Sequence, residues 1–154
     1  MTNETHGEEA LILESIDRFL ERDVKAHVRE LERNDTYPEG MVRQMKEMGL
    51  FGAIIAPEYG GLGLSAEIYA RIVERISIVW MSLTGIFNSH LIMASAVQRF
   101  GTGEQKQRLL PRMATGELQG GVGLTEPDCG TDLQAIRTTA RRDGDHYIVN
   151  GTKT

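Results

Sequence analysis

The chain has 154 residues, of which 40% are hydrophobic and 25% charged, a composition typical of a globular protein of one ordinary domain. Its net charge of −5, from 22 acidic and 17 basic residues, argues against a nucleic-acid-binding surface. A single cysteine, Cys129, excludes an intrachain disulfide and a zinc site of the cysteine type. The N-terminus is polar and acidic, which predicts that it is not a secretory signal. The sequence has no run of about 18 apolar residues, so we predict no membrane span and expect a cytoplasmic protein.

The first hundred-odd residues show helical periodicity. Apolar residues recur at spacings of three and four from Leu13 to Leu31, which predicts one long amphipathic helix. Pro38 suits the first turn of a short helix, Ser65 is a predicted N-cap, and Gly101 a predicted helix end. We predict helices at about 8–33, 39–48, 65–79, 83–100 and 104–115.

Helix 83–100 is apolar nearly all round, which predicts the most buried helix of a bundle. His90 lies on it and is predicted to be a satisfied core histidine rather than a ligand. Trp80 and Met81 are predicted to begin the loop before this helix, where they either join the core or border a pocket. Pro111 is expected to kink or divide the last helix.

After Gly116 the pattern changes to that of strands. We expect strands to begin near residue 119, and the dipeptide Asp143-Gly144, between β-branched segments, predicts a tight hairpin turn there. The fold class is therefore mainly α: a helical bundle in an N-terminal domain, 1–117, followed by the start of a β-domain, 118–154.

The stretch "GLTEPDCGTD", residues 123–132, lies at this junction. Its simplest interpretation is a solvated turn, because Gly, Pro, Asp and Thr are ordinary turn residues. A metal site is disfavoured because no histidine lies near the three carboxylates in sequence. The remaining alternative is a backbone cradle for an anionic or carbonyl-bearing ligand. The residues alone leave the turn and the cradle open.

"GLTEPDCGTD" resembles the T-E-P-x-x-G-[ST]-D signature of the acyl-CoA dehydrogenase family. "APEYGGLGLS", "FGTGEQKQRLLPRMATGE" and "YIVNGTKT" resemble that family's other recurrent segments in the same order, from about residue 8 to 154. The resemblance implies a helical bundle followed by a β-barrel-like domain, with FAD as cofactor and an acyl-CoA substrate. It also implies α,β-dehydrogenation to the 2,3-enoyl-CoA, an electron-transfer flavoprotein or similar acceptor, and a homotetramer in full length.

Carried over by position, the resemblance implies six cofactor-binding residues: Val122, Gly123, Leu124, Thr125, Gly130 and Thr131. Thr125 is expected to meet the edge of the isoalloxazine ring, and Thr131 the pyrophosphate or the thioester substrate. Glu126 and Asp132 are expected to hold the loop, since like charges repel near phosphates.

The family pattern continues beyond "NGTKT", so we expect a fragment that lacks the catalytic base, is inactive alone and binds FAD weakly. Met81 after Trp80, where the glutaryl-CoA branch has an arginine, argues against a dicarboxylate substrate. Two alternative functions remain open: an O2-using oxidase or monooxygenase of the same family, and a non-catalytic helical interaction module.

Overall fold

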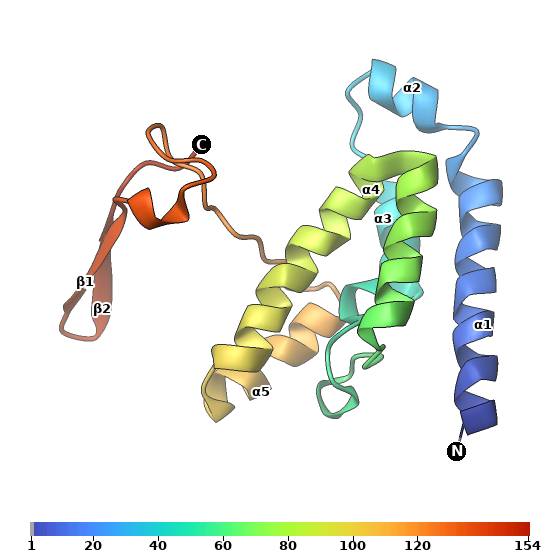
Figure 1. The fold of residues 1–154 in the computed structure, drawn as a ribbon, viewed down its shortest axis with the longest axis horizontal. Coiled ribbons are helices and arrows are strands. Elements are labelled where there is room, and N and C mark those ends of the chain that lie inside the picture. The colour runs from blue at the N-terminus through green and yellow to red at the C-terminus, as the bar shows by residue number, and fades with distance from the viewer. Residues whose placement is uncertain (1) are drawn as a thin grey trace. The chain divides into compact units, whose positions relative to one another are not determined.

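The computed structural model describes residues 2–154, with side chains from residue 9 onward (Figure 1). It divides into two compact units, Met1–Gly121 and Val122–Thr154, the first helical and the second with a two-stranded sheet. The α-helices are α1 (Thr2–Phe19), α2 (Val28–Arg33), α3 (Glu39–Glu47), α4 (Ala66–Phe100) and α5 (Gly103–Ala114). The mainly-α fold class is confirmed, while the domain limits 1–117 and 118–154 stay a prediction.

The single helix expected at 8–33 is wrong. α1 ends at Phe19, a π-helical turn follows at Leu20–Val24, and α2 is a separate short helix. Successive four-residue spacings between apolar residues drift around an α-helix by roughly 40° each. The wider π turn absorbs this drift, and both Leu20 and Val24 remain buried.

Helices predicted at 65–79 and 83–100 are both present, but no loop separates them. They form the two limbs of α4, which meet at Trp80, the one residue of α4 with non-helical dihedral angles (φ −157°, ψ 104°). The limbs fold back on each other (Figure 1). The Tyr69 hydroxyl donates a hydrogen bond to Asn88, and the hydroxyls of Ser77 and Thr84 lie 2.9 Å apart across the kink.

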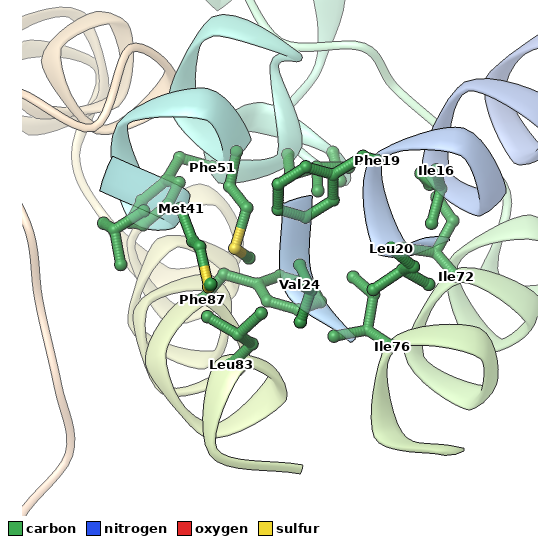
Figure 2. Close-up of a cluster of buried hydrophobic side chains, with 14 of the residues drawn as sticks. Ile16, Phe19, Leu20, Val24, Met41, Phe51, Ile72, Ile76, Leu83 and Phe87 are labelled. Atoms are coloured by element: carbon green, nitrogen blue, oxygen red, sulfur yellow. The ribbon is translucent and has the colours of Figure 1, made fainter. Parts of the chain in front are cut away.

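The hydrophobic core of the first unit lies between α1, the π turn, α3 and both limbs of α4 (Figure 2). The limb 81–100 also supplies residues to a second buried cluster, against α5. It is nevertheless not buried all round, because Ile92 is 52% and Phe100 80% exposed. The largest fully buried side chains are Phe51, Phe87, Ile16, Met45, Leu50, Ile55, Ile68, Ile72, Ile76, Leu83, Leu91 and Leu110.

Capping residues set the ends of the helices, as the sequence predicted for two of them. The Ser65 hydroxyl accepts a hydrogen bond from the Ile68 amide, and Gly101 ends α4. Thr102 and Gln105 add a capping box at the start of α5. α5 runs through Pro111 to Ala114 as one helix, so the proline does not divide it.

Among the described residues, α4 alone is long and apolar enough to cross a membrane by length and composition. Core helices of soluble proteins pass the same test, so this is weak evidence for a span. One face of α4 lines both hydrophobic clusters of the first unit, which accounts for its apolar composition.

The second unit corrects two predictions. Residues 119–125 have no regular secondary structure, so the expected strands near 119 are absent, and the first strand is β1 (Thr139–Asp143). β1 pairs antiparallel with β2 (His146–Asn150), and Asp143 lies opposite His146. The hairpin turn is therefore Gly144-Asp145, not Asp143-Gly144. Gly144 has φ +62°, which suits the type II′ turn, where glycine takes the first central position.

Candidate functional site

The candidate residues 122–131 form an irregular loop at the start of the second unit. Glu126 and Cys129 pair through both backbone hydrogen bonds, of 2.9 and 3.1 Å, and close a tight turn around Pro127 and Asp128. The Cys129 side chain is buried, and its thiol donates to the Asp132 carbonyl at 3.1 Å. This turn gives the loop a fixed shape.

The Glu126 side chain is buried and only 7% exposed. It accepts hydrogen bonds from the Thr138 hydroxyl (2.5 Å), the Thr138 amide (3.0 Å) and the Arg137 amide (2.7 Å). The Lys153 ammonium lies 3.0 Å away. These donors, the Thr138 hydroxyl foremost, lower the pKa of Glu126 from 4.5 to about 2. The carboxylate therefore joins the turn, the segment before β1 and the C-terminal residues.

Three further hydrogen bonds complete the loop. Asp132 accepts a hydrogen bond from the Gln134 amide at 3.2 Å, as in an Asx turn. Lys153 donates to the Leu124 carbonyl at 2.9 Å, and the Thr154 amide to the Thr125 carbonyl at 3.1 Å. The prediction that Glu126 and Asp132 hold the loop thus agrees with their hydrogen bonds.

The six predicted cofactor-binding residues are exposed, in contrast to the buried Glu126. Val122, Gly123, Leu124, Thr125, Gly130 and Thr131 are all exposed. Within residues 2–154, the hydroxyls of Thr125 and Thr131 and the amides of 122–125 have no hydrogen-bond acceptor. The loop therefore encloses the Glu126 carboxylate, leaves Asp128 exposed in an ion pair with Arg137, and keeps free donors on exposed residues, which suits a ligand rich in acceptor atoms.

Sequence reasoning did not assign roles to Arg137, Thr138 and Lys153. Lys153 lies in "YIVNGTKT", a segment already matched to the family, so its position was a usable signal. Arg137 and Thr138 bind Glu126 partly through backbone amides, which no side-chain pattern reveals.

His90 is confirmed as a satisfied core histidine. It is 1% exposed, with both ring nitrogens in hydrogen bonds to backbone groups. Trp80 is also buried, and its indole N–H donates to the Glu32 carboxylate, which Ser82 also binds at 3.0 Å. Trp80, Ser82 and Glu32 line a cavity of about 320 Å³. Met81 beside it is 75% exposed.

Among the residues that the structure describes, no three His, Cys, Asp or Glu side chains are grouped so that they could hold a metal ion. The three carboxylates of the loop are engaged separately. Glu126 and Asp132 bind backbone amides, and Asp128 forms an exposed ion pair with Arg137 at 3.3 Å.

A helical unit followed by an exposed Gly/Thr loop and a β-hairpin agrees with the acyl-CoA dehydrogenase pattern of the sequence. The family described as "Acyl-CoA dehydrogenase, N-terminal domain" matches residues 6–117. This chain therefore belongs to the acyl-CoA dehydrogenase family.

Several relatives extend the similarity beyond the matched domain. The short-chain-specific acyl-CoA dehydrogenase of Clostridium acetobutylicum is 37% identical over 147 residues, covering 95% of this chain and 39% of that relative. The acyl-CoA dehydrogenase structure from Geobacillus kaustophilus has a TM-score of 0.83 and 36% identity, covering 96% of this chain and 39% of its own. An acyl-CoA dehydrogenase complexed with FAD, from Bacillus anthracis, has a TM-score of 0.81 and 31% identity, covering 95% and 26%.

The chain thus spans about two-fifths of the length of the first of these relatives, where it covers 39%.

Proposed function

We propose that this chain is the N-terminal part of an FAD-dependent acyl-CoA dehydrogenase that converts an acyl-CoA thioester to its 2,3-enoyl-CoA. The observation that carries the proposal is that the loop 122–131 combines an internally bound carboxylate with donors that have no acceptor. Glu126 is bound internally, while the hydroxyls of Thr125 and Thr131 and the amides before Glu126 belong to exposed residues and have no acceptor within residues 2–154. The relative from Bacillus anthracis with bound FAD supports the choice of ligand.

The donor set fits a flavin. An isoalloxazine edge offers ring nitrogens and carbonyl oxygens, and a pyrophosphate offers anionic oxygens, so both require N–H and O–H donors. An outward carboxylate would repel the pyrophosphate, but Glu126 is enclosed by its own donors and by Lys153. The loop therefore presents donors without a competing negative charge from Glu126.

The proposed roles follow from the residue types. Exposed Val122 and Leu124 supply apolar contact, Gly123 and Gly130 allow close approach of the backbone, and Thr125 donates to the flavin edge. We assign Thr131 to the pyrophosphate or to the thioester substrate. FAD, when bound, supplies the acceptor of the β-hydride, and this chain's own residues bind and orient it.

The remaining assignments concern the whole protein and rest on the family resemblance. They are the domain limits 1–117 and 118–154, a base outside this chain, a homotetramer, an electron-transfer flavoprotein or similar acceptor, and a cytoplasmic location. Removal of an α-proton needs a base within hydrogen-bond reach. The proposal therefore expects no turnover from these 154 residues alone.

The test is a titration of the ¹⁵N-labelled 154-residue chain with FAD, followed by NMR. We expect saturable shifts of the amides in 122–131, with smaller shifts in the equally exposed hairpin 139–150. A dye-reduction assay with a panel of acyl-CoA thioesters is expected to show no turnover. Absence of shifts in 122–131 at millimolar FAD, or shifts confined to the hairpin, would contradict the flavin assignment.

A further inference from the structure

His90 is a buried polar residue that the proposed reaction does not use. It lies on the second limb of α4, its ring centroid 5.1 Å from that of Phe51. Its Nε2 lies 3.1 Å from the Phe51 carbonyl and 3.0 Å from the Met113 carbonyl. Its Nδ1 lies 3.3 Å from the amide nitrogen of Gly120. One imidazole thus joins three segments that are far apart in sequence.

The partners determine the protonation state of the ring. Two carbonyl oxygens at Nε2 can only accept, so Nε2 carries the hydrogen. The Gly120 amide can only donate, so Nδ1 has a free lone pair and the imidazole is neutral. Burial lowers the pKa of His90, which favours this neutral form. The positive charge of Lys46 on α3 also lowers this pKa.

Gly120 is held closely against the helices by more than this hydrogen bond. A Cβ at Gly120 would lie 2.7 Å from the Cγ and 3.0 Å from the Cβ of Met93, so the backbone approaches α4 as only glycine permits. Leu118, two residues earlier, donates its amide to the Arg112 carbonyl at 3.0 Å. At Gly121, by contrast, a Cβ would meet nothing within 4 Å.

The anchored stretch therefore ends at Gly120, and the second compact unit begins at Val122. Two extended residues span at most roughly 7 Å. Fixing Gly120 consequently restricts where the loop 122–131 can start. Without an acceptor at Nδ1, the Gly120 amide would be left in a partly buried position with no partner, and the anchor would weaken.

We propose that His90 is a positioning residue for the flavin loop: its Nδ1 fixes Gly120 and with it the start of the segment 122–131. The role of that loop rests on the proposed function above, whereas the anchor itself rests on the His90 and Gly120 contacts. Among the described residues, the hydrogen-bond partners of His90 are Phe51, Met113 and Gly120, so its effect on the loop passes through Gly120.

Two complementary variants separate the anchor from the packing of the core. H90Q keeps a donor near the Phe51 and Met113 carbonyls and removes the acceptor at the Nδ1 position. H90N keeps an acceptor near that position and removes the donor at the Nε2 position. Both are compared with the wild-type 154-residue chain by amide hydrogen exchange, ¹⁵N relaxation and histidine ¹⁵N shifts at pH 7.5.

We expect the wild-type His90 to show the Nε2–H tautomer. In H90Q the Gly120 amide should exchange about three- to tenfold faster, with faster motion at Gly121 and Val122. Amides of the limb that carries His90, such as those of Leu91 and Ala94, should keep their wild-type exchange rates. H90N should restore slow exchange at Gly120.

Unchanged exchange at Gly120 in H90Q would overturn the proposal. Equal acceleration at Gly120, Leu91 and Ala94 in both variants would also overturn it, because His90 would then only support the core. The FAD titration of the wild-type chain is scored separately. If FAD fails to shift 122–131 while H90Q releases Gly120, the flavin function is wrong and the anchor stands. If FAD binds and H90Q leaves both Gly120 and the apparent Kd unchanged, the anchor is wrong.

Discussion

The two units of this protein are stabilised by different physical forces. The helical unit encloses two clusters of apolar side chains, and its largest core residues are almost completely buried. In the second unit both strands are exposed along their whole length, including Tyr147, Ile148 and Val149. Its main polar contacts are the hydrogen bonds that the Glu126 carboxylate accepts from Arg137 and Thr138. Apolar burial stabilises the first unit, and hydrogen bonds to one charged group organise the second.

This difference matters for the proposed function. An isolated two-stranded hairpin is at best marginally stable in water, so Glu126 and the tight turn are the main sources of order near the candidate residues. A loop fixed by its own polar contacts can leave its remaining donors free for a ligand. Five predictions test the contrast between the units.

The largest effect is expected in the helical core. Phe87→Ala removes a fully buried ring that packs edge-on against Tyr69, with centroids 6.3 Å apart. We expect a loss of about 3–5 kcal/mol in the free energy of unfolding, from lost burial and a cavity. Urea denaturation followed by circular dichroism at 222 nm measures it. Ile92→Ala, on the same limb but 52% exposed, is the control and should cost much less. A similar loss in the free energy of unfolding for both variants would contradict the core position of Phe87.

A smaller and local effect is expected in the hairpin. Gly144→Ala places a Cβ at φ +62°, which costs roughly 1–2 kcal/mol of hairpin stability. Asp145→Ala, the other residue of the turn, is the control. The population of the hairpin is measured from cross-strand NOEs between Arg141 and Ile148, which are paired in the register. Unfolding of the helices should be unaffected, because the hairpin lies in the second compact unit. A shift in the urea midpoint of the helices would contradict this expectation.

Acid should affect the two units in a defined order. The folded pKa of His90 lies below 6.5, so its stabilising contribution is complete above pH 6.5 and is lost as the pH falls towards the folded value. The pKa of Glu126 falls from 4.5 to about 2, so its contribution is complete above pH 4.5 and is lost between pH 4.5 and about 2. Protection of the Gly120 amide, measured relative to the intrinsic exchange rate at each pH, should therefore begin to fall at a higher pH than protection of the Arg137 and Thr138 amides.

Glu126→Gln tests the contribution of the Glu126 charge at constant pH. It removes the charge that attracts the Arg137 and Thr138 amides, so we expect both to exchange about tenfold faster. Asp128→Asn, on an exposed carboxylate of the same turn, is the control and should leave both rates unchanged. If Glu126→Gln leaves the exchange unchanged, the charge of Glu126 does not organise the loop.

The smallest effect concerns the proposed ligand contact. Thr125→Val removes one hydroxyl, and we expect FAD binding to weaken by roughly 0.5–1.5 kcal/mol. Thr125→Ser keeps the hydroxyl and serves as the control. The same NMR titration gives both apparent Kd values, and an altered flavin absorbance on binding to the wild type should be reduced in the valine variant. Equal Kd values for valine and serine would remove Thr125 from the site.

The sequence by itself determined the local features of this protein. Ser65, Gly101 and the apolar periodicity each act within a few residues, and they predicted helices at 39–48 and 104–115 and both limbs of α4. The motif "GLTEPDCGTD" identified the family that the comparison with residues 6–117 then showed. The core role of His90 also followed from its apolar surroundings in the sequence.

Tertiary structure decided the features that depend on partners distant in the chain. The π turn at Leu20–Val24 keeps two side chains in a core built by other helices, and the limbs of α4 fold back through contacts such as Tyr69 with Asn88. Glu126 and Lys153 are 27 positions apart in the printed sequence yet lie 3.0 Å apart in space. Periodicity and turn preferences describe neighbours along the chain, and they carry no information on which distant backbone amide will satisfy a buried carboxylate or imidazole.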